Sequence, residues 1–398
     1  MANKVAVVGI SNMKCERKRP DVTYWQMLYD AAKEAVEDAG VDHKEIPICL
    51  YGAATEVMLR RFIAAPSVAE VLGWSGRTLI LYCNAGGSTG ATIRDAHLWI
   101  SSGQAELVLV VGGEKISDAD VPGHPGFHNI VVYGNDNTFE MPFGTAVAQF
   151  GILCQAYMYT YGITEEQAAK VSVKNYGNAM LNPTSQAPKK VTVEDVLKSR
   201  VIAYPIKALD CSVITDVMVA AVFASEERAK KLKKQPVWVE ACGYANDTDK
   251  LGYREVMNPG TKMCQPQCLR KAAQMAYQKA GIKDPAKEID IAEIQDGYSW
   301  LELMTYEMLD FCREGQGGKL IDEGLTYREG DLPVNASGGC IGHAHAGGAA
   351  GLMSLVEVVR QLRGECGPYQ VKPIPRVGLS ESMGGSGMSL AGVQILRG

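Results

Sequence analysis

The feature that most limits the fold of this chain is an internal repeat of one helical pattern. Residues 28–41 read L-x-x-A-A-x-x-A-x-x-x-A-G-V, and residues 269–282 read L-x-x-A-A-x-x-A-x-x-x-A-G-I. Apolar residues at this spacing form one face of an amphipathic helix, and the glycine that follows is typical of a helix C-terminus. Each copy lies between two apolar runs with the composition of β-strands, which are residues 5–10, 48–51, 237–241 and 289–294. The chain is therefore predicted to be an α/β protein built from two similar halves.

A second repeat lies close to residues that can carry chemistry. Residues 84–90 read N-A-G-G-S-T-G and residues 345–351 read H-A-G-G-A-A-G, and each segment begins a helical pattern. Glycine-rich helix starts allow close backbone packing and leave free N–H groups that point at whatever lies before them. Cys83 precedes the first segment and His345 begins the second, so we expect both starts to face one site across a pseudo-twofold axis. In the alternative interpretation, the glycines only allow two buried helices to pack.

The two halves are predicted to span residues 1–235 and 236–398. Within the first half, residues 115–201 interrupt the alternation of strands and helices with Gly, Pro, Asn and polar helical patterns. We interpret this stretch as an inserted loop or cap region that covers the site.

Composition and charge exclude several classes of function. The 398 residues carry a net charge of −5 without any block of five like charges, so neither nucleic-acid nor membrane binding is expected. No apolar run approaches the roughly 18 residues of a membrane helix, and the first residues lack a signal-peptide pattern, so a cytoplasmic location is expected.

The eleven cysteines are scattered along the sequence, as expected for reduced thiols. Cys264 and Cys268 lack a second pair of ligands at metal spacing, so no metal site is expected.

Four motifs in chain order resemble those of one enzyme superfamily. They are C-N-A-G-G at residues 83–87, D-C-S at 210–212, N-A-S-G-G at 335–339 with H-A-G-G at 345–348, and S-M-G-G-S-G at 382–387. The thiolase superfamily has C-A-S-G-G, D-C-S, N-P-S-G-G with G-H-P, and C-x-G-G-x-G in the same order. The sequence therefore resembles thiolases over essentially the full chain. The similarity is greatest to the archaeal and sterol-carrier-protein type, which works with a small zinc-ribbon and OB-fold companion subunit.

This resemblance implies a fold, a reaction and partners. The thiolase fold has duplicated α/β halves with mixed five-stranded sheets in a layered αβαβα arrangement, plus an inserted loop domain. The implied reaction is CoA-dependent retro-Claisen cleavage of a β-ketoacyl-CoA, with coenzyme A as co-substrate and no bound cofactor. A homodimer is implied because family members join their sheets across a twofold axis, and a small subunit that binds the acyl-CoA is implied beside it.

The resemblance also assigns roles that agree with physical chemistry. A cysteine just before a helix N-terminus lies in positive potential that favours the thiolate, so Cys83 is the predicted nucleophile. By resemblance, His345 is the base, and the N–H groups of Cys83 and Gly384 form one oxyanion hole. Gln295 is implied to orient a water in a second hole shared with His345. Four further residues are assigned to substrate binding, which are Tyr298, Ser382, Met383 and Gly339.

Two positions depart from the family pattern. Thiolases protonate the departing carbanion with a second cysteine, and the two places where relatives carry it are Gly297 and Ser382 here. Neither can act as a general acid near neutral pH, because glycine has no side chain and a serine hydroxyl is too weak an acid. Cys340 and His343 are the preferred substitutes, ahead of Tyr298.

These departures leave three functions open. The first is retro-Claisen cleavage through an acyl-Cys83 intermediate, with a bulky or unusual substrate such as benzoylsuccinyl-CoA. The second is retro-aldol cleavage of a β-hydroxyacyl-CoA with a companion subunit, which needs no acyl-enzyme. The third is a non-catalytic scaffold that binds CoA. Relatives that perform the aldol reaction tend to lose both the nucleophilic cysteine and the catalytic histidine, so the presence of Cys83 and His345 favours the first function.

Overall fold

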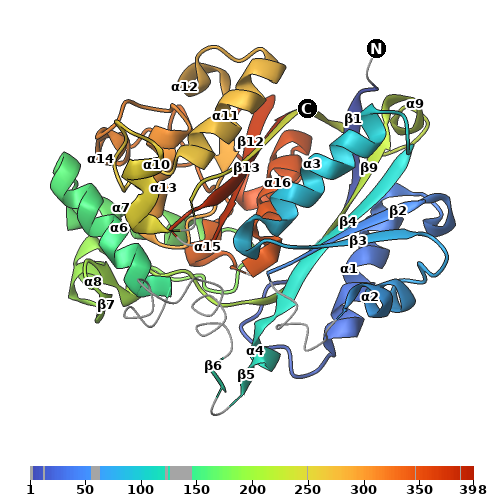
Figure 1. Cartoon of the computed structure of the whole chain (residues 1–398), viewed down its shortest axis with the longest axis horizontal. Helices are drawn as coiled ribbons and strands as arrows, with labels where there is room; N and C mark the ends of the chain where they lie inside the picture. Colours follow the sequence, from blue (N-terminus) through green and yellow to red (C-terminus); the bar gives the residue numbers. More distant parts are fainter. Residues whose placement is uncertain are drawn as a thin grey trace.

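Strands from both halves of the chain form one large mixed sheet with helices around it (Figure 1). The computed structural model describes every residue except 1–2, 12–13, 55–62, 122–123, 126–145, 249, 346 and 386, and only the backbone of 119–121 and 124–125. The first half supplies five strands, which are β1 (Val5–Ile10), β2 (Ile48–Ala53), β3 (Thr78–Cys83), β4 (Leu107–Lys115) and β9 (Asp216–Ser225). The second half supplies four, which are β10 (Val237–Asn246), β11 (Ile291–Glu293), β12 (Val377–Gly384) and β13 (Leu390–Arg397).

The strand pairings of the two halves repeat, as the duplicated sequence predicts. In the first half β2 lies between β3 and β4 and is parallel to both, and β4, β9 and β1 follow in antiparallel pairs. In the second half β11 is parallel to β12, and β12, β13 and β10 again follow in antiparallel pairs. On the other side of β11, Val334 forms a single parallel bridge with Ala292, at the place that β3 occupies beside β2.

The sheet differs from two separate five-stranded sheets in two respects. The fifth strand of the second half is reduced to the Val334 bridge, so four strands are formed there among the described residues. In addition, β1 pairs antiparallel with β10 through Ala6 with Trp238 and Val7 with Val237, which joins the halves into one nine-stranded sheet. The mixed α/β class and the layering match the predicted fold.

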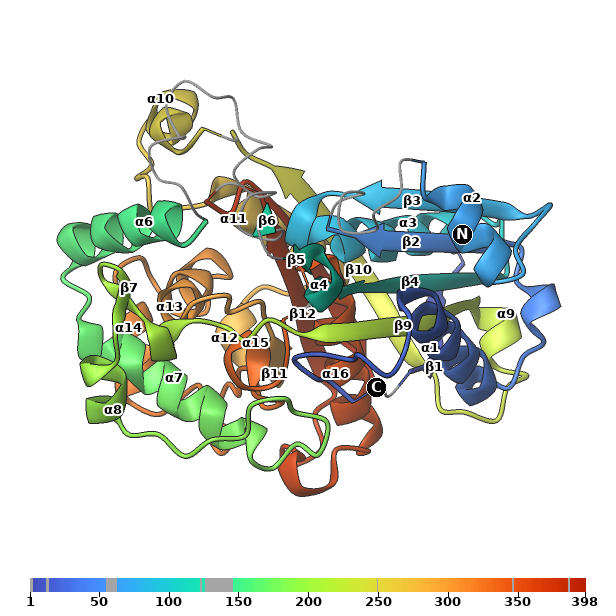
Figure 2. The same ribbon diagram turned by 90° about the horizontal axis from the view of Figure 1, so that it is seen from below.

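Alternating strand side chains produce the layers, because successive residues of a strand face opposite sides of the sheet. Val5 and Val7 of β1 pack into a core with α3 (Ser88–Ser101) and α16 (Ala350–Arg363), which lie between the two half-sheets. Ala6 and Val8 face the other way, into a core with α1 (Tyr24–Ala39). Helix α11 (Gln267–Ala280) covers the corresponding outer face of the second half, as Figures 1 and 2 show.

The helices of the predicted inserted region pack on the second half of the chain (Figure 2). They are α6 (Ala146–Tyr161), α7 (Glu165–Ala179) and α8 (Val193–Lys198), with the hairpin of β7 (Val201–Ala203) and β8 (Ile206–Lys207) after them. Helix α7 begins at a capping box in which Thr164 and Gln167 exchange side-chain hydrogen bonds. The partners of this region are α13 (Ser299–Met308), α14 (Gly317–Asp322) and α15 (Gly339–Gly342).

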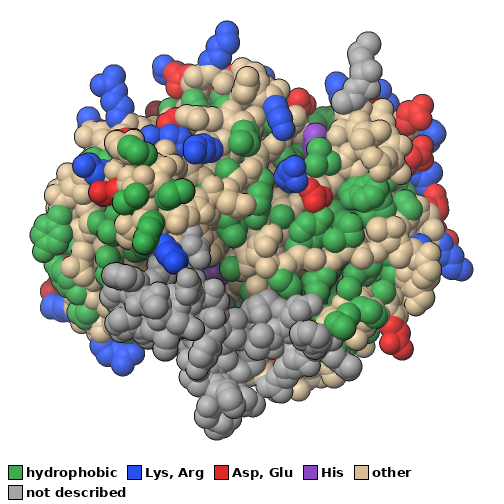
Figure 3. All heavy atoms as spheres, viewed as in Figure 1, with side chains coloured by type: hydrophobic (Ala, Val, Ile, Leu, Met, Phe, Trp, Pro, Cys, Tyr) green, Lys and Arg blue, Asp and Glu red, His purple; other side chains and the backbone are tan. Residues whose placement is uncertain are grey.

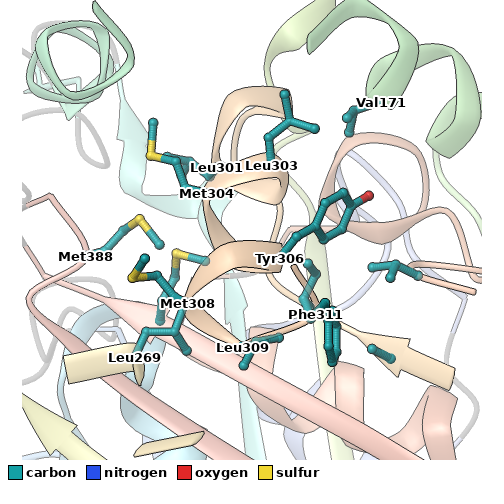
Figure 4. Close-up of a cluster of buried hydrophobic side chains, with 14 of the residues drawn as sticks. Val171, Leu269, Leu301, Leu303, Met304, Tyr306, Met308, Leu309, Phe311 and Met388 are labelled. Carbon is teal, nitrogen blue, oxygen red and sulfur yellow. The ribbon is translucent and has the colours of Figure 1, made fainter. Parts of the chain in front are cut away.

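Helix α13 is buried along its whole length and forms the centre of the largest hydrophobic core. Figure 4 shows its apolar side chains, among them Met304 and Met308, with Met308 next to Met388 and to Leu269 of α11. The remaining short elements are α2 (Ala65–Val71), α4 (Ile116–Ala119), β5 (Asp120–Val121), β6 (His124–Pro125), α9 (Glu226–Ala229), α10 (Arg254–Met257) and α12 (Pro285–Glu288). None of the helices described combines the length and the apolar character needed to cross a membrane.

Candidate active site

Cys83 is the last residue of β3, where the strand passes into the turn that begins α3. All eleven cysteines lie in the described part of the chain, and Cys83 alone among them is exposed. The N–H of Asn84 donates to Ser88 Oγ at 2.6 Å. The N–H of Ala85 donates to the Ala54 carbonyl at 3.1 Å. A fixed backbone therefore presents the thiol to solvent near the positive end of a helix, which favours the thiolate.

His345 makes three hydrogen-bond contacts with Ser212 of the D-C-S motif and with Thr215, which follows it. Its Nδ1 lies 2.7 Å from Ser212 Oγ, and its N–H donates to Thr215 Oγ1 at 3.0 Å. The carbonyl of His345 accepts the N–H of Thr215 at 3.2 Å. The ring is partly buried, and this burial lowers the pKa of His345 to about 4, so the imidazole is neutral at physiological pH. Ser212 stands in a motif that the sequence resemblance identifies, but its contact with the histidine could not be derived from spacing.

The two glycine-rich helix starts meet in the structure. A β-carbon placed on Gly351 would lie 3.2 Å from the nitrogen of Gly90, and one placed on Gly348 would lie 2.5 Å from the carbonyl carbon of Ala53. Thr89 Oγ1 donates to the Gly348 carbonyl at 2.8 Å, which ties α3 to the segment before α16. Because Ala53 is the strand partner of Cys83, this contact brings the turn of the nucleophile and the segment of the histidine to the same side of the sheet.

Gln295 and Gly384 both contact the turn that follows Cys83. A β-carbon on Gly384 would lie 2.6 Å from the Gly87 nitrogen, so only glycine allows this approach. The side-chain oxygen of Gln295 accepts the N–H of Met383 at 3.0 Å. A β-carbon on Gly86 would lie 2.6 Å from Nε2 of Gln295 and 2.3 Å from the Met383 carbonyl. The structure thus places Gln295, Met383 and Gly384 against the nucleophile turn.

The two departures from the family pattern occupy different surroundings. A β-carbon on Gly297 would lie 3.9 Å from Cε1 of His345, at ordinary contact distance, so this position adjoins the histidine and leaves space beside it. Ser382 is buried and faces the helix starts, since β-carbons on Gly90 and Gly351 would lie 2.1 and 3.0 Å from its Oγ. Its hydroxyl therefore points at the place where the starts of α3 and α16 pack together.

Tyr298 lies beside the inserted helices. Its ring centroid is 5.1 Å from that of Phe150 on α6, and its backbone bridges Cys211. Burial raises the pKa of the Tyr298 phenol, which makes it a weaker acid than an exposed tyrosine. The N–H of Ser212 donates to the Gly297 carbonyl at 3.0 Å, so the segment before Tyr298 is joined to the segment that holds His345.

Cys340 lies against Asp296, the residue that follows Gln295. It is buried on α15, and its N–H donates to Oδ1 of Asp296. Burial and the nearby carboxyl of Asp296 raise the pKa of the Cys340 thiol. Gly339 takes a positive φ of 58° and lies so close to Asp296 that a β-carbon would be 2.4 Å from its Oδ1. No described contact joins either residue to Cys83 or His345.

His343 faces yet another direction. Its Nε2 lies 3.0 Å from Thr184 Oγ1 and 3.6 Å from the Cys15 sulfur, and burial lowers its pKa. Glu357 and Arg360 line the same small cavity. Cys340 and His343, the two residues predicted as substitute acids, are both buried and line one further small cavity together with Glu357. Their role in catalysis stays a prediction.

A buried polar network behind the site supports its backbone. Asn175 Nδ2 donates to Asp296 Oδ2 and to Glu302 Oε2, at 2.7 Å in both cases. Asn335 donates to Glu302 Oε2 at 2.7 Å and accepts the Ile294 N–H at 2.8 Å, which fixes the segment that leads to Gln295. Lys174 pairs with Glu302 at 2.6 Å. Sequence reasoning missed this network, because its hydrogen-bonded partners are 33 to 127 residues apart.

The described residues contain no group of three or more His, Cys, Asp or Glu side chains that could hold a metal ion. The reactive groups that this arrangement brings together are the thiol, the neutral imidazole, the backbone N–H groups and the amide side chain. An exposed thiol and a neutral base beside fixed N–H donors are the groups that acyl transfer requires.

Comparisons with known proteins identify the family of this chain. The chain matches the thiolase N-terminal domain over residues 5–227 and the thiolase C-terminal domain-like family over residues 257–397. It is 32% identical to the acetyl-CoA acetyltransferase of Methanothermobacter thermautotrophicus, over 97% of this chain and 98% of the relative. It is 28% identical to the benzoylsuccinyl-CoA thiolase subunit BbsB of Thauera aromatica, over 97% and 96%. The solved Ltp2-ChsH2(DUF35) aldolase has the same fold, with a TM-score of 0.83 at 23% identity over 99% and 97% of the two chains. The chain therefore belongs to the thiolase family and is a thiolase-type acyltransferase.

Proposed function

We propose that the protein cleaves a β-ketoacyl-CoA by a CoA-dependent retro-Claisen reaction through an acyl-Cys83 intermediate. The observation that carries this proposal is the exposed thiol of Cys83 on a turn against which Gly384 packs. In the first half-reaction His345 takes the thiol proton, and the sulfur attacks the keto carbonyl of the substrate. The bond between the α and β carbons then breaks, the α carbon takes up a proton, and the shortened acyl-CoA departs.

In the second half-reaction the thiol of free CoA attacks the acyl-Cys83 thioester. The acyl group passes to CoA, and the Cys83 sulfur regains a proton. Both half-reactions pass through tetrahedral oxyanions, which need donors already in place. We assign this task to the N–H groups of Cys83 and Gly384, and we assign the enolate oxygen to His345 and a water oriented by Gln295.

For the substrate we propose benzoylsuccinyl-CoA or another bulky β-ketoacyl-CoA. The relative from Thauera aromatica carries benzoylsuccinyl-CoA in its name. The missing side chain at Gly297 supports the same proposal, because it leaves room directly beside His345 where relatives keep a cysteine.

The experiment that tests this function is mass spectrometry of the protein with β-ketoacyl-CoA substrates. Without free CoA, a cleavable substrate should leave an acyl group on the tryptic peptide of Cys83, and added CoA should remove it as a second acyl-CoA. A set that includes acetoacetyl-CoA and benzoylsuccinyl-CoA would identify the substrate class. Cleavage without any adduct would contradict the acyl-enzyme.

Retro-aldol cleavage of a β-hydroxyacyl-CoA is the second candidate. It is favoured by one feature of the site, since neither Gly297 nor Ser382 offers the acid that a thiolase uses. The same spectra separate the two functions, because an aldolase would release an aldehyde or ketone from a β-hydroxyacyl-CoA and leave Cys83 free. A protein that binds CoA but cleaves neither substrate class would be a scaffold.

We expect Gly297→Cys to raise turnover of a simple β-ketoacyl-CoA by about tenfold or more, within the range of general acid catalysis. The β-carbon of the new cysteine would lie 3.9 Å from Cε1 of His345 without a clash. From there its thiol can protonate the departing carbanion. Steady-state kinetics would check this, with Gly297→Ser as the control that adds a side chain without an acid.

Cys340→Ala and His343→Ala address the buried candidates in the same assay. A loss of about a hundredfold in either variant, with the Cys83 adduct still formed, would identify that residue as the proton source. Normal turnover in both variants would leave a water oriented by Gln295 as the donor.

We also propose a homodimer that uses the open edge of β3 and works with a small acyl-CoA-binding subunit. Strand β3 ends the sheet, so its outer N–H and C=O groups have no strand partner among the described residues. Apolar side chains gather on this part of the surface (Figure 3).

Light scattering of the wild-type protein should give the mass of a dimer, and Ile80→Lys, on β3, should dissociate this dimer. Tyr159→Lys, on the exposed side of α6, should leave the dimer intact. A wild-type monomer would contradict the proposal.

A further inference from the structure

The chain between β12 and β13 connects two residues that both rest on the nucleophile turn. Gly384 ends β12 and Leu390 begins β13, and the two are paired across the strands. A β-carbon on Gly87 would lie 1.9 Å from Cδ1 of Leu390, and one on Gly384 would lie 2.6 Å from the Gly87 nitrogen. We call the described residues of the connection between them, Gly385 and residues 387–389, the closing loop. Any shift of this loop would move both contacts with the turn that follows Cys83.

The closing loop has a backbone conformation that needs support. Gly385, Gly387 and Met388 have positive φ values of 74°, 53° and 65°. Positive φ is uncommon for a residue with a side chain, so Met388 is held there by its surroundings. Its side chain is buried next to Met308 and Leu269 (Figure 4), and its carbonyl accepts a hydrogen bond from the Cys268 thiol at 3.1 Å.

One buried guanidinium binds the carbonyl groups of this loop. Arg254, on α10, has no exposed surface. Its Nη2 donates to the Gly387 carbonyl at 2.6 Å and to the Met388 carbonyl at 3.5 Å, and its Nη1 donates to the Met263 carbonyl at 2.7 Å. A planar guanidinium holds several acceptors in one fixed geometry, which an ammonium group cannot do. Arg254 therefore ties the closing loop to the segment of residues 254–263.

Asp247 completes this clamp. Its Oδ2 lies 3.3 Å from Nε of Arg254, and both side chains are almost fully buried. The N–H of Asp247 donates to the Ser389 carbonyl at 2.6 Å, so the pair also holds the end of the closing loop. The remaining acceptor positions of Asp247 are used by Asn258 Nδ2 at 3.0 Å and the Gln267 N–H at 3.2 Å.

We propose that Arg254 is a positioning residue for the acyl-transfer site. It fixes the closing loop, and through the loop it keeps Gly384 against the turn of Cys83. This inference rests on the proposed function, because it assigns the Gly384 N–H to the oxyanion hole. Arg254 touches no residue that we expect to react, so its effect on the rate would be indirect.

The test compares Arg254→Met with a matched control, Arg363→Met. Arg363 is an equally buried guanidinium that binds two carbonyls, of Gln235 at 3.0 Å and Val7 at 3.3 Å, and it lies 3.5 Å from Asp38. Neither carbonyl belongs to an element that carries a site residue. Any general effect of deleting a buried arginine should therefore appear in both variants.

We expect Arg254→Met to acylate Cys83 about 30 to 100 times more slowly than wild type, because small misplacements of catalytic groups have effects of that size. KM should change little and the pH profile should keep its shape, since arginine stays protonated throughout. Arg363→Met should acylate at the wild-type rate. Hydrogen exchange of peptides that span residues 383–390 should become faster only in Arg254→Met.

Arg254→Lys serves if Arg254→Met does not fold. Lysine keeps a positive charge opposite Asp247 but loses the fork, so exchange in the closing loop should still rise and acylation should still slow. Wild-type acylation with wild-type exchange in a folded Arg254 variant, or equal losses in Arg363→Met, would overturn the inference. If wild type itself forms no adduct, the proposed function fails, and the exchange experiment alone then decides whether Arg254 holds the loop.

Discussion

Replacing Cys83 with serine is expected to lower the rate of CoA-dependent cleavage by about four orders of magnitude or more, the scale on which removal of a catalytic nucleophile acts. A serine hydroxyl is not ionised near neutral pH, so it gains little from the helix start that favours a thiolate. The side chain is exposed, and oxygen replaces sulfur with little change of shape. The variant should therefore unfold at the same temperature as wild type.

Cys312→Ser is the matched control for this prediction. Cys312 is a half-buried thiol that follows α13, away from the nucleophile turn, and burial raises its pKa. Its serine variant should cleave substrate at the wild-type rate. Stopped-flow assays of the consumption of free CoA thiol, with melting curves of all three proteins, would measure both effects. Near-normal turnover in Cys83→Ser would rule out the acyl-Cys83 mechanism.

The duplicated pattern predicted the helices and their ends well, because local chemistry determines both. Helices α1 and α11 end before Gly40 and Gly281, whose positive φ values of 68° and 73° are those of glycine C-caps. The apolar spacing indicates the body of each helix and the flanking strands, but α1 begins at Tyr24 and α11 at Gln267, before the repeated pattern starts. The reduction of the fifth strand of the second half to the Val334 bridge has no such local signal, since strand length there depends on what packs against it.

The position of a candidate site residue could be predicted where its own neighbours in sequence hold it, and could not be predicted where distant segments meet. Cys83 lies at a helix start because the turn of residues 84–88 closes on itself. The direction of the Ser382 side chain depends instead on which face of β12 packs against α3 and α16. Successive residues of a strand point to opposite faces, and the sequence of β12 alone does not show which face meets these helices. Ser212 lies 133 residues from its partner His345, so the contact became visible only in the fold.

The locations of Cys340 and His343 illustrate the same limit. Both stand within five residues of His345 in sequence and were the preferred substitute acids. The short helix α15 turns the chain between them, so that one faces Asp296 and the other faces Thr184. Closeness in sequence therefore did not reveal which groups each side chain contacts, and the prediction that either residue supplies the proton depends on the alanine variants.

His345→Ala should slow acylation of Cys83 by about a hundredfold to ten thousandfold, the usual contribution of a general base. Because burial lowers the pKa of His345 to about 4, the imidazole stays neutral and able to accept the thiol proton throughout the neutral range. Between pH 7 and about pH 5 the wild-type acylation rate should therefore not fall through protonation of His345. The rate should fall only as the pH approaches 4. An exposed histidine, with a pKa of about 6.5, would become protonated and stop acting as a base at a pH more than one unit higher.

Ser212→Ala separates the position of the base from its presence. An imidazole that accepts the thiol proton at Nε2 must carry its own proton on Nδ1, which can donate to Ser212 Oγ 2.7 Å away. Without this partner the ring loses the fixed tautomer and orientation, so acylation should slow by about tenfold, less than in His345→Ala, while the acid limb near pH 4 remains. Rates of adduct formation from pH 4 to 8 in the three proteins would check this. A wild-type limb near pH 6.5, or a His345→Ala variant that keeps the wild-type limb, would show that another group is the base.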